Sequence, residues 1–421
     1  MSTPRLSEIM SEGPVIDGLL DIDFYKFTMG QFILKYFSKA QVRFSFVLRT
    51  KGVRLSETIP EAELRAELDR VMEMSFSRTD LRYDERMFKE DYLTHLLNLR
   101  PPRYCLSIED GQYRIEVEGH WADVTYWETM VLSAVNELYY RNRLKAMSPG
   151  ERDLVFATGI TRLHNKIKVL REHPEITFTD FGTRRRFSRA WQAYVVRTLA
   201  EELPESQFLG TSNTRLAERL ALLPMGTNAH ELFMAVAALI GRDDRSLLTS
   251  HNLVLTKWWE MYGWGLSIAL TDTFGTGFFF QDMTPSQAAE WKGLRQDSGD
   301  PIVFGEAAIA FYQNLSLDPR EKLIVFSDGL DLATMIKLAK RFQGRIRTTF
   351  GWGTNLTNDL GLSPLSMVMK VTAARWEEVD DWTGTVKLSD NLAKAMGPAA
   401  EVERYKRVFG YSGNFRAECT Y

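Results

Sequence analysis

Hydrophobic and polar residues alternate along the first part of the chain in the patterns of strands and amphipathic helices. In residues 41–49 every second side chain is apolar, which predicts a strand with one solvent-exposed face. Apolar residues spaced three or four apart within residues 64–71 predict a helix, and the dense apolar run of residues 23–38 predicts a buried one. Asp110-Gly111, between two β-rich runs, predicts a hairpin.

From about residue 125, helical runs alternate with short apolar stretches that end in small or charged residues. Seven strands are expected, at residues 176–179, 207–209, 222–225, 266–271, 292–295, 323–326 and 345–349. The loops after the strands of a parallel β/α barrel gather at one rim, so this many polar strand ends favour an irregular or incomplete barrel. A doubly wound open sheet would concentrate such groups at one or two switch points.

These patterns predict an α/β protein with two domains. Residues 1–125 are expected to form an α+β domain, and residues 126–379 an irregular β/α barrel domain. The C-terminal residues 380–421 are expected to return to the first domain.

Composition narrows the function classes. The chain of 421 residues carries 52 basic and 55 acidic side chains, well mixed, so no basic stripe suggests a nucleic-acid partner. Its two cysteines, Cys105 and Cys419, suit a reducing cytosol. The N-terminal residues lack the apolar core of a signal peptide, and no run of about 18 apolar residues would span a membrane. We expect a soluble cytoplasmic protein.

The predicted strand ends carry side chains that suit a phosphorylated sugar. The charged ones are Arg184, Arg185, Arg186, Arg295, Asp272, Asp297, Asp300 and Asp328. Arginine binds phosphate or carboxylate with paired hydrogen bonds, and one or two carboxylates suffice for a Mg²⁺–phosphate substrate. Each of these charges has a competing role as a helix cap or rim salt bridge.

The segment Phe350-Gly-Trp-Gly-Thr-Asn-Leu-Thr-Asn-Asp359 follows the last predicted strand. Gly351 and Gly353 allow backbone N–H groups to turn inward, and Thr354 adds a hydroxyl donor, as in a phosphate cradle. An ordinary αβ connection with capping residues is the alternative reading of the same residues.

His230 stands in Gly226-Thr-Asn-Ala-His-Glu231, with Thr227 or Asn228 expected as the N-cap of the following helix. A histidine in the first turn faces the positive end of the helix dipole, which favours the neutral imidazole. Neutral imidazole is a nucleophile, so a phosphohistidine is chemically reasonable. From spacing alone, a capping or packing histidine is the commoner case.

Several strings together resemble the nicotinate phosphoribosyltransferase family of NAD salvage, and the similarity runs through nearly the whole chain. They are Asp23-Phe-Tyr-Lys-Phe-Thr-Met-Gly-Gln31, Asp180-Phe-Gly-Thr-Arg-Arg-Arg186, Gly210-Thr-Ser-Asn213, Gly226-Thr-Asn-Ala-His-Glu231, Gly293-Leu-Arg-Gln-Asp-Ser-Gly-Asp-Pro301, Phe326-Ser-Asp-Gly-Leu330 and the Phe350–Asp359 segment. The resemblance implies transfer of phosphoribosyl from phosphoribosyl pyrophosphate to nicotinate, with Mg²⁺ and with ATP as a co-substrate. It also implies a homodimer in which one subunit's tyrosine reaches its partner's site.

The resemblance further implies roles for individual residues. Tyr25 and Phe181 would sandwich the pyridine ring, and Arg184 would face its carboxylate. Ser212, beside Thr211, stands where nicotinamide-using relatives place an aspartate, so the pocket is expected to admit nicotinate. Like-charge exclusion is a common source of such specificity.

At the sugar-phosphate end, the resemblance gives Asp272 and Asp297 the ribose hydroxyls or Mg²⁺-bound water, and Arg295 the pyrophosphate or the pyridine carboxylate. Gly329 and Gly353, next to Asp328 and Thr354, would hold the 5′-phosphate. His230 would become phosphorylated by ATP. The rival readings are a nicotinamide or quinolinate phosphoribosyltransferase, or a non-catalytic sugar-phosphate-binding protein on the same scaffold.

Overall fold

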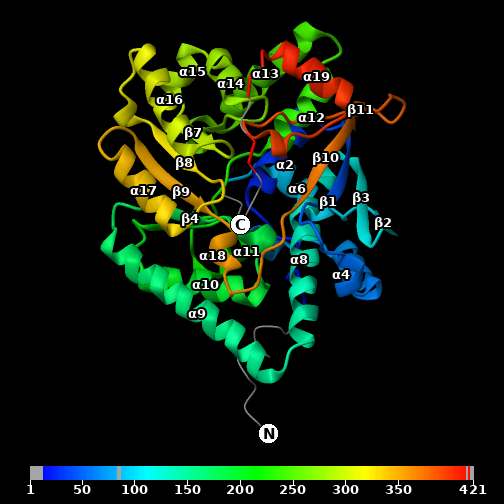
Figure 1. The fold of residues 1–421 in the computed structure, drawn as a ribbon. Helices are drawn as coiled ribbons and strands as arrows, with labels where there is room; N and C mark the ends of the chain where they lie inside the picture. Colours follow the sequence, from blue (N-terminus) through cyan, green and yellow to red (C-terminus); the bar gives the residue numbers. More distant parts are fainter. Residues whose placement is uncertain (1–12, 83–86, 414–415, 418–421) are drawn as a thin grey trace.

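A computed structural model describes residues 13–82, 87–413 and 416–417. The N-terminal stretch considered for a signal peptide, and Cys419, lie outside these residues. Two sheets organise the chain, one antiparallel and one parallel (Figure 1). No helix among the described residues is long and apolar enough to cross a membrane.

The antiparallel sheet has five strands in the order β11-β10-β1-β3-β2. Their bounds are β1 Gln41–Leu48, β2 Tyr104–Glu109, β3 Gln112–His120, β10 Met367–Arg375 and β11 Thr383–Gly384. The predicted alternation is confirmed in β1, where Val42, Phe44 and Phe46 are buried. Asp110 and Gly111 both have positive φ, as the predicted tight hairpin turn requires.

The parallel sheet has six strands in the order β5-β4-β9-β8-β7-β6. Their bounds are β4 Phe178–Asp180, β5 Phe208–Thr211, β6 Ile268–Leu270, β7 Gly293–Gln296, β8 Leu323–Phe326 and β9 Arg347–Trp352. Six of the expected strands are therefore confirmed. The sheet ends at β5 and β6, and no strand pairing among the described residues joins these two edges.

The strand expected at residues 222–225 is wrong. This segment makes one isolated parallel bridge, between Thr211 and Pro224, and otherwise has no sheet pairing among the described residues. Proline has no backbone N–H to donate to a ladder, which limits the pairing that so short a segment can make.

Helices cover both sheets and join them (Figure 1). The longer ones are α2 Tyr25–Tyr36, α4 Glu61–Met72, α6 Glu90–Asn98, α8 Trp127–Lys145, α9 Pro149–Glu172, α10 Arg189–Glu202, α12 His230–Ile240, α13 Asp244–Tyr262, α16 Pro301–Asn314, α17 Leu332–Phe342 and α19 Ala399–Val408. The shorter ones are α3 Leu55–Thr58, α5 Arg78–Leu81, α7 Trp121–Val124, α11 Thr214–Leu220, α14 Thr276–Asp282, α15 Pro285–Glu290 and α18 Thr354–Thr357.

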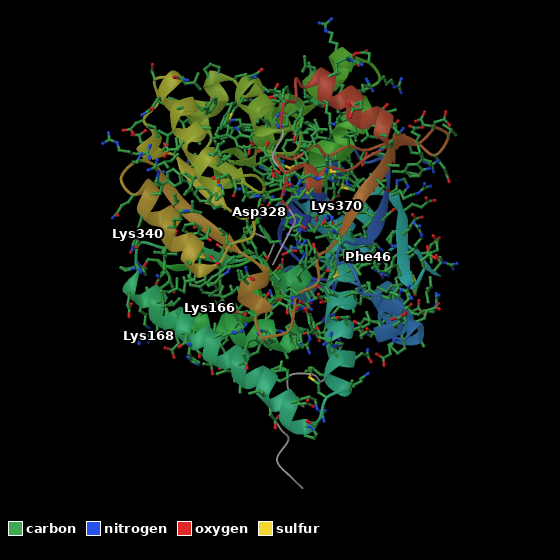
Figure 2. All side chains as sticks on the ribbon, in the orientation of Figure 1. Phe46, Lys166, Lys168, Asp328, Lys340 and Lys370 are labelled. Carbon is green, nitrogen blue, oxygen red and sulfur yellow. The ribbon has the colours of Figure 1, made fainter. Side chains whose placement is uncertain are left out.

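The two sheets meet through α8 and α12, which both contact β10. Most residues of both helices are buried. Besides β10, α8 contacts the 3-10 helix Thr183–Arg185 that follows β4, and α12 packs on α13. The chain returns to the antiparallel sheet at β10, whose pairing with β1 is antiparallel. Figure 2 labels Asp328, after β8, and Lys370, on β10, which approach the same central region from opposite sides.

Candidate active site

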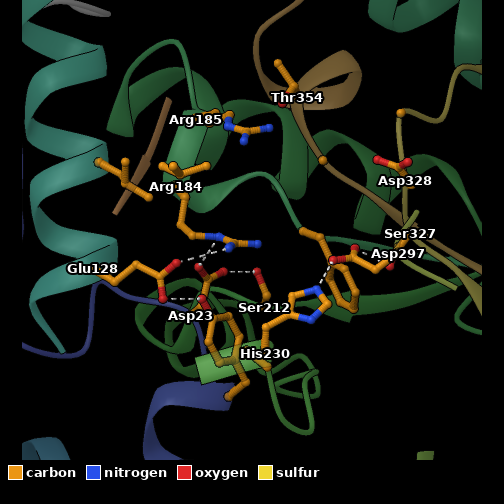
Figure 3. A pocket seen from close by; sticks show the side chains of 18 of the residues that line it. Asp23, Glu128, Arg184, Arg185, Ser212, His230, Asp297, Ser327, Asp328 and Thr354 are labelled. Atoms are coloured by element: carbon orange, nitrogen blue, oxygen red, sulfur yellow. Dashed lines mark hydrogen bonds and ion pairs between the residues drawn. The ribbon is translucent and has the colours of Figure 1, made fainter. Parts of the chain in front are cut away.

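A cavity lies between β10 of the antiparallel sheet and the carboxyl ends of the parallel strands (Figure 3). Most of the predicted site residues line it, namely Tyr25, Phe181, Arg184, Ser212, His230, Arg295, Asp297, Asp328, Gly329, Gly351, Gly353 and Thr354. Because the carboxyl ends of parallel strands share one edge, loops far apart in sequence meet here.

Two aromatic side chains enter the cavity from elements distant in sequence. Tyr25 is the first residue of α2, and Phe181 follows β4. Both belong to one chain. The homodimer with a shared tyrosine stays a prediction. Gly351 leaves room for the Phe181 ring, because a Cβ added at this position would lie 2.3 Å from the ring Cδ2. The close approach of ring and backbone therefore requires glycine.

The wall of the cavity near Ser212 carries two acidic side chains, Asp23 and Glu128, which the sequence alone did not indicate (Figure 3). The Ser212 hydroxyl donates to Asp23 Oδ1 at 2.6 Å. Arg184 Nε lies 3.2 Å from Asp23 Oδ2, and its Nη1 lies 3.7 Å from Glu128 Oε1. Burial raises the pKa of Asp23 above its usual value, although Arg184 and Ser212 oppose the rise. The Arg184 guanidinium thus lies close to two carboxylates, and one of them, Asp23, accepts from Ser212.

His230 is the first residue of α12, as expected, but the predicted N-cap is wrong. Ala229 occupies the N-cap position and makes no side-chain cap, so neither Thr227 nor Asn228 caps this helix. The His230 imidazole contacts Thr273 Oγ1 through Nδ1 at 3.0 Å. Its Nε2 lies 2.9 Å from both Asp297 Oδ2 and Lys387 Nζ.

Burial and the neighbouring Lys387 ammonium together lower the pKa of His230 to about 4, against the two nearby aspartates. The imidazole is therefore neutral at pH 7, as the sequence predicted. The dominant cause is desolvation, which disfavours the charged ring.

Asp297 and Asp272 flank His230. Burial raises the pKa of Asp297, but the hydrogen bond with His230 and the Arg295 charge outweigh it and hold the pKa well below its usual value. Asp272 is 1% exposed and accepts from Ser298 through Oδ2. Its Oδ1 has no hydrogen-bond partner among the described residues. A buried carboxylate oxygen without a partner is a candidate ligand for a cation or a substrate hydroxyl.

The opposite end of the cavity combines the loops after β8 and β9. Gly329 has a φ of +58° and Gly353 precedes α18, and both line the cavity with Thr354. Lys394 Nζ lies 2.5 Å from Asp328 Oδ1 and donates to the Asp297 carbonyl at 3.0 Å. This lysine therefore connects the loops after β7 and β8.

Two family models match the chain, one for the nicotinate phosphoribosyltransferase N-terminal domain over residues 20–136 and one for the nicotinate phosphoribosyltransferase family over residues 176–413. The chain belongs to the nicotinate phosphoribosyltransferase family. A crystal structure of nicotinate phosphoribosyltransferase from Porphyromonas gingivalis is 33% identical, with a TM-score of 0.83 over 94% of this chain and 100% of that chain. The Vibrio cholerae nicotinate phosphoribosyltransferase is 31% identical, with a TM-score of 0.85 over 96% of each chain.

Within this nicotinate phosphoribosyltransferase fold, four cationic side chains line the cavity that were not predicted from the sequence. They are Arg49, Lys370, Lys387 and Lys394. Arg49 follows β1, Lys370 lies on β10, and the two other lysines follow β11, so all four come from the antiparallel sheet or from the segment after it. The run Val386-Lys-Leu-Ser-Asp390 was the available signal for Lys387, but its position beside His230 depends on the return of the chain.

Thr211 does not appear among the described residues that line the cavity. It is fully buried, and its hydroxyl donates to Asp180 Oδ2 at 2.7 Å. Asp180 also accepts from the Gly182 N–H at 2.7 Å and from Gln192 at 2.8 Å. Through Asp180, Thr211 therefore stabilises the loop that carries Phe181, although it does not line the cavity itself.

Proposed function

We propose that this protein transfers phosphoribosyl from phosphoribosyl pyrophosphate to the pyridine nitrogen of nicotinate, giving nicotinate mononucleotide and pyrophosphate. The observation that carries the proposal is one cavity lined by Tyr25, Phe181, His230 and the Gly353 loop, in a chain of this family. A flat pyridine ring stacked on an aromatic face gains about 1 kcal/mol. Arg184 supplies a cation near Tyr25, with its guanidinium 5.4 Å from the ring centroid.

The reaction breaks the bond between ribose C1 and a pyrophosphate oxygen as the pyridine nitrogen bonds to C1. This nitrogen has no proton to lose, so the step needs no general base, and catalysis rests on positioning and charge. Asp297, held ionised, faces the positive charge that develops on the ribose. The leaving pyrophosphate would be held by Arg49, Arg295, Lys387 and Lys394, which line the same cavity.

Mg²⁺ fits this site as a cofactor. His230, Asp272 and Asp297 bring possible ligand atoms within 4.8 Å of one another, and Asp272 Oδ1 lacks a hydrogen-bond partner among the described residues. Mg²⁺ prefers oxygen ligands and keeps several waters, so the two carboxylates would hold it directly or through water. When bound, the ion would supply positive charge for the substrate phosphates.

ATP hydrolysis is proposed to couple to synthesis through His230. Its imidazole is buried and neutral, and Lys387 lies 2.9 Å from Nε2, where it would neutralise an arriving phosphate. Transfer of the γ-phosphate forms an N–P bond at the imidazole and releases ADP. Water then takes the phosphoryl group and regenerates the imidazole.

Nicotinamide is the second candidate substrate, because the carboxylates of Asp23 and Glu128 would accept its amide N–H groups. We favour nicotinate because Arg184 lies beside both carboxylates, and because the family resemblance implies an aspartate at the position of Ser212 in nicotinamide-using relatives.

The test is a competition assay with phosphoribosyl pyrophosphate, Mg²⁺ and equal nicotinate and nicotinamide. We expect nicotinate mononucleotide as the main product. Predominant nicotinamide mononucleotide would replace the proposal with the second candidate, and no mononucleotide would reject both.

A further inference from the structure

Two buried charges stand directly behind the residues proposed to bind nicotinate and phosphate. Lys26 follows Tyr25 in α2, and Glu231 follows His230 in α12. Tyr25 and His230 line the cavity, whereas Lys26 and Glu231 are 0% and 1% exposed and point into the protein. Neither buried charge has a part in the reaction proposed above.

Lys26 and Glu231 bind each other across the two helices. Lys26 Nζ lies 2.5 Å from Glu231 Oε2 and 2.7 Å from Glu128 Oε2. The second Glu231 oxygen accepts from Trp121 Nε1 and Thr125 Oγ1, both at 2.7 Å. Glu231 therefore has partners on both oxygens, and the Lys26 ammonium lies between two carboxylates.

Glu128 extends this contact to the cavity wall (Figure 3). Its Oε1 lies 2.8 Å from Lys370 Nζ and 3.7 Å from Arg184 Nη1. A continuous series of alternating charges therefore runs from the start of α12 to the guanidinium beside Tyr25.

The energetics favour a geometric role for the pair. Replacing a buried ion pair by apolar side chains is often neutral or stabilising, so a buried pair is weak evidence for stability alone. Removing one partner instead leaves an uncompensated buried charge, which the surrounding groups must move to relieve. Here the groups that would move are the first turns of α2 and α12.

We infer that Lys26 and Glu231 are positioning residues of the active site: their ion pair joins the starts of α2 and α12 and sets Tyr25 relative to His230. The inference rests on the proposed function, since it assumes that Tyr25 serves the pyridine ring and His230 the phosphoryl group. This one ion pair thereby sets the position of the nicotinate pocket relative to the histidine of the ATP-dependent step.

The test measures two separate reactions in the full-length protein. The first is kcat/KM for nicotinate, and the second is the rate at which [γ-³²P]ATP alone labels His230. In Lys26→Met, the carboxylates of Glu231 and Glu128 face each other without the ammonium. We expect kcat/KM to fall about 100-fold, the loss that a displacement near 1 Å produces, and His230 labelling to slow as well. Glu231→Gln should lower both values less, because an amide oxygen still accepts from Lys26.

Arg141→Met is the matched control. Arg141 pairs with the buried Glu137 at 2.6 Å, but both residues lie on α8, so this pair joins no two helices of the site. We expect Arg141→Met to lower the thermal midpoint while both reactions stay close to parent values. Because Lys26→Met removes the contact that Glu231→Gln only weakens, the double variant should lose less than the sum of the two.

Parent-like values for either reaction in Lys26→Met would overturn the inference, as would equal losses in Arg141→Met. If circular dichroism shows that Lys26→Met is unfolded, Glu231→Gln is judged by the same two values. A parent protein that forms no nicotinate mononucleotide rejects the proposed function instead, so the two failures are distinguishable.

Discussion

The close contact between Gly351 and Phe181 gives a direct test of the pyridine pocket. In Gly351→Ala the new Cβ would lie 2.3 Å from Phe181 Cδ2 and 2.4 Å from Cε2. Ordinary contact begins at 3.4 Å, so the ring must move by about 1 Å. The backbone at Gly351 does not have a positive φ, so alanine adds no backbone strain there.

A displaced Phe181 ring loses stacking on nicotinate worth about 0.5 to 1.5 kcal/mol. Since about 1.4 kcal/mol is a factor of ten, the KM for nicotinate should rise roughly two- to tenfold. Steady-state assays with nicotinate varied at saturating phosphoribosyl pyrophosphate would measure this rise.

Gly305→Ala is the control for overpacking. A Cβ at Gly305 would lie 2.1 Å from Phe342 Cζ, and neither residue lines the cavity. Overpacking costs about 1–3 kcal/mol of stability in each variant. A nicotinate KM that stays at the parent value in Gly351→Ala, or that rises equally in Gly305→Ala, would refute the placement of Phe181 against the substrate.

Three further predictions concern the proposed reaction. His230→Ala should abolish stimulation by ATP and leave a slower ATP-independent synthesis, measured as product with and without ATP; equal stimulation in variant and parent would contradict the phosphohistidine. Ser212→Asp places a third carboxylate beside Asp23 and Glu128 and should strongly lower kcat/KM for nicotinate, whereas an unchanged value would show that this residue does not face the carboxylate. Because the pKa of His230 is lowered to about 4, its labelling by ATP should be flat from about pH 5.5 to 7.5, and an inflection near 6.5 would contradict a neutral imidazole.

The sequence predicted those parts of the fold that local pattern determines. Alternation located β1, and the polar residues after the short apolar runs located the carboxyl ends of six parallel strands. Residues 222–225 have the same apolar character, but Pro224 lacks the N–H that a strand ladder needs. The predicted N-cap of α12 is wrong because Ala229 occupies this position, and the helix starts there without a capping side chain.

Most of the predicted site residues lie in the loops of the parallel sheet. The four cavity-lining cations that were not predicted come from the antiparallel sheet or from the segment after it. Lys370 and Lys387 reach the cavity because β10 pairs with β1 across more than 300 residues of sequence. Asp23 was part of a quoted string, but its hydrogen bond to Ser212 depends on how α2 meets the loop after β5. No local pattern encodes such long-range contacts, because tertiary packing decides them.

We propose ATP-coupled synthesis of nicotinate mononucleotide for this protein. The most direct measurement incubates the protein with nicotinate, phosphoribosyl pyrophosphate, Mg²⁺ and ATP, and quantifies nicotinate mononucleotide and ADP in the same sample by mass spectrometry. We expect both to accumulate together, and ADP production to fall when His230 is replaced by alanine. Absence of nicotinate mononucleotide in the presence of all four components would contradict the account.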